Sequence, residues 1–228
     1  MNDDRVAIGD AWGAALLDHL EGRDGDMLVL ELEEGVGVPA LDAEWFFRSE
    51  PEWEPEEREL LAAVTAGPVL DLGAGAGRAA LHLQGRGLEV VAVENSPGAA
   101  EVCRRRGVRD VRTTDLNDPP TDRAWRAVLL LCGNIGLGGS WEGIRRLLRR
   151  LAEISAPGAV LVTDSVNDAG QGEIGLRLRY GDLATPWWRQ RNVSAAEAPA
   201  LVEGTGWRIV RRLHAPNDFD HYLLLERE

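Results

Sequence analysis

Short apolar runs alternate with helix-forming segments through the middle of the sequence, and this alternation limits the fold more than any other feature. Five runs predict strands, of which the last two are typical of buried strands: PVLDLGAG (68–75), LEVVAVENSP (88–97), VRDVRTTDL (108–116), WRAVLLLCGNIG (125–136) and AVLVTDSVND (159–168). Helical segments separate most of them, including the amphipathic stretch at 140–158. Strands that alternate with helices form a parallel sheet with helices on both faces. We therefore predict an α/β fold, a three-layer sandwich around a mostly parallel sheet.

The segments on either side of this alternation have other patterns. Three elements are expected before it: a helix at 6–22, a short strand or hairpin arm at 27–35, and a helix at about 55–65. After it, residues 176–193 predict two strands around a turn, and the last two strands should pair antiparallel because no helix separates them. We predict an N-terminal helical cap at 1–55 and a domain at 56–228 whose hairpin at about 170–193 acts as a lid.

Charge is unevenly distributed along the 228 residues, whose net charge is −13. Residues 1–67 hold 18 acidic residues against four arginines, whereas residues 68–228 are close to neutral. An acidic leading segment repels phosphate backbones, so no nucleic-acid partner is expected. The sequence contains no lysine, which excludes a lysine-dependent phosphate loop or a Schiff base.

Membrane, secretion and metal signals are missing from the sequence. No apolar run reaches the roughly 18 residues of a membrane span, and the acidic N-terminus does not resemble a secretory signal. We therefore expect a cytoplasmic protein without a membrane partner. Cys103, Cys132 and the four histidines lack metal-ligand spacing, so no metal is expected.

The stretch VLDLGAGAGR (69–78) places three glycines directly after a strand, where a ligand can approach backbone amides. A phosphate loop requires another spacing and a lysine. In a dinucleotide fingerprint that starts at Gly73, the third glycine would fall on Arg78. A register that starts at Gly75 and ends on Ala80 remains open, although it moves the turn two residues into the helix.

A third pattern consists of Asp71, Gly73, Gly75 and Gly77. It resembles motif I of the class I S-adenosylmethionine-dependent methyltransferases. The physical basis is that S-adenosylmethionine carries an ammonium and a sulfonium but no phosphate, so a carboxylate at the strand end suits it. The resemblance implies a seven-stranded sheet in the order 3-2-1-4-5-7-6 with the last strand antiparallel.

Polar residues at the later strand ends extend the resemblance. Glu94, followed by Asn95, ends the second strand and is expected to accept the ribose hydroxyls, a feature shared with NAD-binding folds. The resemblance implies that Asp115 accepts the adenine amino group and that the Leu116 amide meets a ring nitrogen. It places the methyl group and the acceptor beside Asn134.

The predicted activity is methyl transfer from S-adenosylmethionine to a small molecule through an amine, a carboxylate or an acidic hydroxyl. Asn134 and Asp164 are the candidate catalytic residues, and the protein is expected to be a monomer or a homodimer. An NAD(P)-dependent oxidoreductase, a non-catalytic binding protein of the same fold and an aminopropyl transferase remain as alternatives. Aromatic residues of the cap (Trp45, Phe46, Phe47) and hairpin (Trp187, Trp188) either close over the strand ends or pack.

Overall fold

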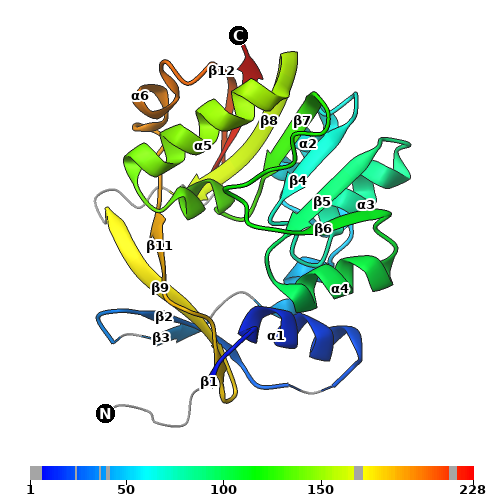
Figure 1. Ribbon diagram of the computed structural model, residues 1–228, viewed down its shortest axis with the longest axis vertical. Coiled ribbons are helices and arrows are strands. Elements are labelled where there is room, and N and C mark those ends of the chain that lie inside the picture. Colours follow the sequence, from blue (N-terminus) through cyan, green and yellow to red (C-terminus); the bar gives the residue numbers. More distant parts are fainter. Residues whose placement is uncertain (1–6, 24, 36, 40–41, 167–171, 216–219) are drawn as a thin grey trace.

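The computed structural model describes residues 7–23, 25–35, 37–39, 42–166, 172–215 and 220–228, which build a large sheet and a small one (Figure 1). The strands of the large sheet are β4 (Val69–Leu72), β5 (Val90–Glu94), β6 (Asp110–Thr113), β7 (Trp125–Leu130), β8 (Ser155–Val166), β12 (Trp207–His214) and β13 (Asp220–Arg227). Their order is β12-β13-β8-β7-β4-β5-β6. β4 to β8 are mutually parallel, and β13 is antiparallel to both β8 and β12. The strand order and the antiparallel last strand predicted from the resemblance are confirmed.

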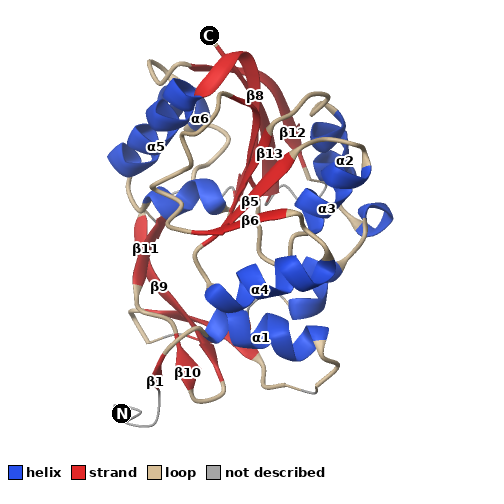
Figure 2. Cartoon of the chain, turned by 45° about the vertical axis from the view of Figure 1, so that its right-hand side comes forward, coloured by secondary structure: helices blue, strands red, loops and turns tan. Residues whose placement is uncertain are grey.

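Helices cover both faces of the large sheet, as the alternation predicts (Figure 2). They are α2 (Pro55–Ala62), α3 (Arg78–Gly85), α4 (Pro97–Arg106), α5 (Trp141–Ile154) and α6 (Ala198–Val202). One apolar core lies between the sheet and α5 with α6, and the other lies beneath α2 and α3. The apolar stripe of α5, from Ile144 to Leu151, is buried in the first core. Within the described ranges, no helix is long and apolar enough to cross a bilayer.

The small sheet combines strands from two distant parts of the sequence. The N-terminal part supplies β1 (Ala7–Ile8), β2 (Leu28–Leu32) and β3 (Gly37–Pro39), and the insertion supplies β9 (Glu173–Tyr180), β10 (Leu183–Ala184) and β11 (Trp188–Arg191). β2 pairs with one edge of β9, while β10 and β11 pair with its other edge. The expected hairpin is therefore present, but the expected helical cap is a mixed segment that shares a sheet with it.

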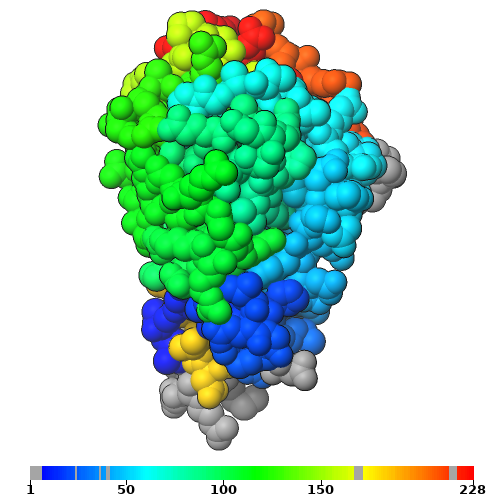
Figure 3. Space-filling model, turned by 90° about the vertical axis from the view of Figure 1, so that its right-hand side faces the viewer, coloured from blue at the N-terminus to red at the C-terminus, as the bar shows by residue number. Residues whose placement is uncertain are grey.

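The helical part of the N-terminal segment packs on the large domain. It consists of α1 (Ala11–Leu20) and the short 3₁₀ helices η1 (Ala43–Phe47) and η2 (Glu50–Glu52). Helix α1 lies against α4 and β9, so it joins the two sheets at one end of the molecule (Figures 1 and 3). This arrangement places α1 beside the carboxyl ends of the parallel strands.

Candidate functional site

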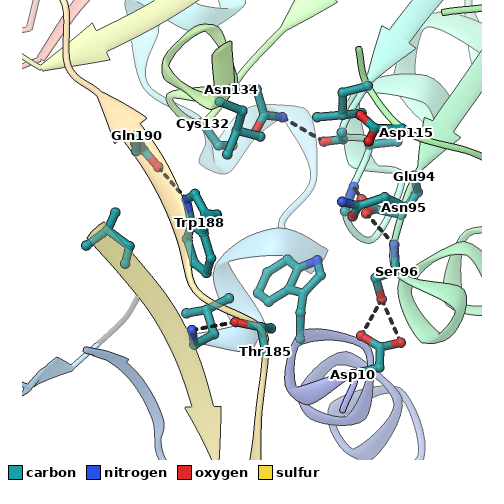
Figure 4. A pocket seen from close by; sticks show the side chains of 18 of the residues that line it. Asp10, Glu94, Asn95, Ser96, Asp115, Cys132, Asn134, Thr185, Trp188 and Gln190 are labelled. Atoms are coloured by element: carbon teal, nitrogen blue, oxygen red, sulfur yellow. Dashed lines mark hydrogen bonds between the residues drawn. The ribbon is translucent and has the colours of Figure 1, made fainter. Parts of the chain in front are cut away.

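A cavity of about 860 Å³ separates the two sheets (Figure 4). One wall consists of the carboxyl ends of β4, β5, β6 and β7 with the loops that follow them, and the other is the inner face of the small sheet. Helix α1 and η1 contribute to the same cavity. The strand order reverses between β4 and β7, and open α/β sheets bind ligands at such a switch point.

The glycine turn lies at the centre of the first wall, where Gly73 and Gly75 line the cavity. Gly73 has a φ of +77°, and a Cβ atom there would lie 2.2 Å from Asn134 Nδ2. Of the described residues, only Trp12 and Phe46 have atoms within 4 Å of a Cβ atom on Gly75, and both are ring atoms at 3.6 Å. The absent side chain of Gly75 therefore leaves room for a ligand beneath these rings. Gly77 does not line the cavity, because its position is packed against Val108.

Glu94 ends β5 beside this turn and lines the cavity, although its side chain is only 4% exposed. Its Oε2 accepts the Gly75 N–H at 2.9 Å, and its Oε1 accepts the Ser96 N–H at 3.1 Å. Burial raises the pKa of this carboxyl, while the N–H groups of Ser96 and Gly75 oppose the rise. Glu94 is thus held rigidly, and each oxygen keeps a lone pair for a ligand.

Asp71, in β4, carries a buried carboxyl oxygen, Oδ2, that has no hydrogen-bond partner among the described residues. The residue is 2% exposed and lines the cavity. Burial raises the pKa of Asp71 to about 7, with Arg78 opposing the rise and Glu94 adding to it. The guanidinium of Arg78 is already bound to Glu57, 2.8 Å away. An unpartnered buried carboxyl oxygen, on a residue that lines a cavity, suits a cationic hydrogen-bond donor.

The other predicted site residues follow β5, β6 and β7. Asn95, Asp115 and Leu116 all line the cavity. Asp115 lies two residues beyond the end of β6 and accepts the Asn117 N–H at 2.8 Å. Asn134 begins the 3₁₀ helix η3 (Asn134–Gly138) rather than ending a strand. Its Nδ2 donates to the carbonyls of Leu72 and Gly73 at 3.1 and 3.0 Å, so it holds the glycine turn in place.

Two residues near β7 and β8 lie differently from the sequence expectation. Asp164 does not line the cavity, and its carboxylate accepts the Gly133 N–H at 3.3 Å. Burial and the nearby Glu57 raise the pKa of Asp164 to about 7. Cys132, which follows an apolar strand and would be expected in the core, instead lines the cavity with a φ of +61°. Desolvation raises the pKa of its thiol, so it is not a thiolate at neutral pH.

The opposite wall is apolar. Alternate residues of β2 and β9 line the cavity: Leu28, Leu30, Leu176 and Leu178. Because side chains alternate along a strand, Glu31, Arg177 and Arg179 lie on the outer face, where both arginines bind Glu31 at 2.6 Å. Trp188 and Gln190 of β11 extend the inner face, and the indole N–H donates to Gln190 Oε1 at 3.3 Å (Figure 4).

The aromatic residues divide between lining and packing. Phe46, Trp187 and Trp188 line the cavity. Trp45 and Phe47 instead cover guanidinium groups, those of Arg78 and Arg106, with 4.0 and 4.6 Å between charge and ring centroid.

Sequence reasoning did not identify Asp10, Trp12, Arg78 and Gln190 as lining residues. Arg78 directly follows the glycine motif, and this position could have indicated that it lies at the cavity. The other three belong to the segments outside the alternating region, where no motif marks them. Among the described residues, no cluster of three or more His, Cys, Asp and Glu side chains could hold a metal ion.

Known proteins match the chain by sequence. A family model described as a methyltransferase domain matches residues 69–158. A protein of Mycobacterium tuberculosis (strain H37Rv) described as an uncharacterized methyltransferase is 32% identical over 116 residues, which are 50% of this chain and 46% of that protein. The chain thus spans about half the length of the curated relatives it matches.

Solved structures match over more of the chain. An S-adenosylmethionine-dependent methyltransferase from Bacteroides fragilis, crystallised with S-adenosyl-L-homocysteine, is 25% identical with a TM-score of 0.83. The match covers 96% of this chain and 94% of that one, so the cap and small sheet belong to the shared fold. A 1,6-didemethyltoxoflavin-N1-methyltransferase from Burkholderia thailandensis shares the fold at 18% identity, with a TM-score of 0.56 and 76% of each chain covered.

Proposed function

The chain belongs to the class I S-adenosylmethionine-dependent methyltransferases, whose cofactor is S-adenosylmethionine, and from this premise we propose that it methylates a small molecule. The observation that carries the proposal is the Asp71 oxygen at the glycine turn, for which the described residues provide no hydrogen-bond partner. The cofactor's ammonium group would supply the missing donor there, and Glu94 would accept the ribose hydroxyls. Asn95, Asp115 and the Leu116 amide would surround the adenosine. The absence of a side chain at Gly75, beneath the Trp12 and Phe46 rings, would help to admit the methionine chain.

The same charges argue against a nicotinamide dinucleotide. Four acidic side chains line the cavity: Asp10, Asp71, Glu94 and Asp115. Arg78 is the one lining residue with a permanent positive charge among those described, and Glu57 already neutralises it. A pyrophosphate there would lose its hydration and meet carboxylates instead of donors. The cavity is also open rather than filled by side chains, which favours an enzyme over a binding protein with an eroded pocket.

When bound, the cofactor supplies a methyl group on a cationic sulfur, which is already electrophilic. This chain's residues then need to align the acceptor and exclude water, which in well-oriented systems lowers a barrier by roughly 7–11 kcal/mol. Asn134 helps to align the cofactor with the acceptor, because its side chain holds the glycine turn in place. The small sheet, which we propose as the lid, excludes water with its leucines and Trp188. The lining residues of the small sheet include no titratable side chain among those described, so any general base would have to come from the acidic residues of the opposite wall.

The lining favours an amine among the three acceptor groups expected from the sequence. Among the described residues, a carboxylate acceptor would find no unpaired cation on the small-sheet wall. An amine would bind as its ammonium ion, which aromatic rings and carboxylates attract, and it would pass a proton to a carboxylate or to water before its nitrogen accepts the methyl group. An acidic hydroxyl, neutral before it reacts, is the second choice. We propose an amine on an apolar body that packs on the leucines and Trp188.

Calorimetric titration with S-adenosylmethionine, S-adenosylhomocysteine and NAD tests the cofactor assignment. We expect both sulfur compounds to bind and NAD not to bind. E94Q should lower the affinity for S-adenosylhomocysteine at least about tenfold, because the substitution replaces a charged hydrogen-bond acceptor. Tight binding of NAD alone would overturn the proposal.

Turnover with 2-phenylethylamine and with the matched acid 3-phenylpropionate then tests the acceptor. Methylation of the acid in preference to the amine would contradict the amine assignment.

A further inference from the structure

Asp10 joins two helices at the edge of the cavity. It precedes α1, and its Oδ1 accepts the Gly13 N–H at 2.8 Å as a helix cap. The same carboxylate accepts the Ser96 hydroxyl at 2.8 and 2.9 Å and the Gly98 N–H at 2.8 Å. Ser96 and Gly98 stand at the start of α4, so one carboxylate caps α1 and α4 together (Figure 4).

The two helices touch at this point through glycine. A Cβ atom on Gly98 would lie 2.6 Å from the Gly13 Cα, and a Cβ atom on Gly13 would lie 2.3 Å from Asp10 Oδ2. No larger residue fits at either position without moving a backbone. The position of α1 on the large domain is therefore fixed by backbone contact and by the hydrogen bonds of Asp10.

From Asp10 a continuous chain of contacts leads to the cofactor site. Ser96, which donates its hydroxyl to Asp10, also donates its N–H to Glu94 at 3.1 Å. Glu94 in turn accepts the N–H of Gly75 in the glycine turn. On the other side, α1 carries Trp12, which lines the cavity and packs edge-on against Phe46 with 4.6 Å between centroids.

We propose that Asp10 is a positioning residue, which fixes α1 on α4 and, through Ser96, holds Glu94 in its ligand-binding orientation. Both oxygens of Asp10 already accept protein donors, so it acts through Ser96 rather than on the ligand. Movement of α1 would displace Trp12 and loosen Glu94 together. The cap and the cofactor site are therefore coupled. This inference rests on the proposed function, because it takes Glu94 as a cofactor ligand.

S-adenosylhomocysteine binding by calorimetry tests the coupling in the full chain, with D10N, S96A and S140A compared with wild type. Ser140 is a matched control because its hydroxyl caps α5 at 3.0 Å, just as the Ser96 hydroxyl caps α4 at 3.0 Å. Each alanine variant loses one helix N-cap that contributes a similar free energy to stability. Of the two serines, only Ser96 contacts Asp10. We expect D10N and S96A to weaken binding at least about fivefold and S140A to change it less than about twofold.

A double variant separates coupling from general loosening of the fold. Because Asp10 and Ser96 act through one link, D10N/S96A should bind S-adenosylhomocysteine no more weakly than D10N alone. Additive losses, or equal losses in S96A and S140A, would overturn the coupling. Wild-type protein that does not bind S-adenosylhomocysteine would instead contradict the proposed function. All titrations are made well below each variant's unfolding temperature.

Discussion

Desolvation raises the pKa of two carboxyl groups, Asp71 and Asp164, to about 7, but their positions differ. Asp71 lines the cavity, and its Oδ2 has no hydrogen-bond partner in the part of the chain that the structure describes, as expected of a group that binds a ligand. Asp164 does not line the cavity, and it accepts the Gly133 N–H in the loop that leads to Asn134. We therefore expect Asp71 to act on ligand binding and Asp164 to act on stability.

Replacing Asp164 with Asn should alter how the stability of the ligand-free protein depends on pH. The unfolded carboxyl ionises near pH 3.8, whereas the folded one keeps its proton until about pH 7. The unfolded state binds fewer protons in this interval, so Asp164 makes the free energy of unfolding fall as pH rises from about 4 to about 7. D164N removes that fall, which is on the order of a few kcal/mol.

Denaturant unfolding of both proteins between about pH 4 and about pH 8 measures this effect. The difference in stability between D164N and wild type should shift in favour of D164N up to about pH 7 and stay constant above it. A difference that does not change with pH would show that Asp164 ionises normally. The same variant should bind S-adenosylhomocysteine within about twofold of wild type, because Asp164 does not line the cavity.

At the level of elements, the sequence indicates the large sheet but not the small one. The central strands β4, β5, β7 and β8 lie in apolar runs, and the turn after β4 carries the glycines that brought the family resemblance and with it the strand order. The small sheet pairs Leu30 with Leu178, which are far apart in the sequence, and such long-range pairing leaves no local signal. For the same reason the predicted site lacked Asp10 and Gln190, which lie in segments without a motif.

Strand β11 offers a test of the acceptor wall, since neighbouring side chains point to opposite faces. Trp188 lines the cavity, so W188A should lower kcat/KM for the best amine acceptor roughly tenfold or more by removing apolar contact area. Its affinity for S-adenosylhomocysteine should stay within about twofold of wild type, since the cofactor ligands proposed here lie on the other wall. Steady-state kinetics and calorimetry provide the two readouts.

R189A is the matched control for W188A. Arg189 is the next residue, and its guanidinium binds Glu33 rather than lining the cavity. An exposed ion pair contributes little to stability, so R189A should keep both readouts near wild type. Equal loss of activity in the two variants would mean that the strand as a whole, rather than the indole, is needed.

On the scale of the whole molecule, the boundary expected at residues 55 and 56 does not separate independent units. The N-terminal segment pairs with the insertion through β2 and β9 and packs on α4 through α1. Arg106 of α4 adds further links, donating to the carbonyls of Phe46 and Phe47 in η1 at 3.3 Å. Because these contacts hold the cap on both sides of the cavity, we expect cap and large domain to unfold together.

Thermal unfolding tests this expectation and the ligand together. Calorimetry should show one transition whose calorimetric and van't Hoff enthalpies agree. S-adenosylhomocysteine at about 100 times its Kd should stabilise the folded state by about 2.7 kcal/mol, which raises Tm by about 5–11 °C in a protein of this size. The whole transition should move, because residues of both the large domain and α1 line the cavity. A separate transition at lower temperature that the ligand leaves in place would mean that the cap unfolds alone and takes no part in holding the cofactor.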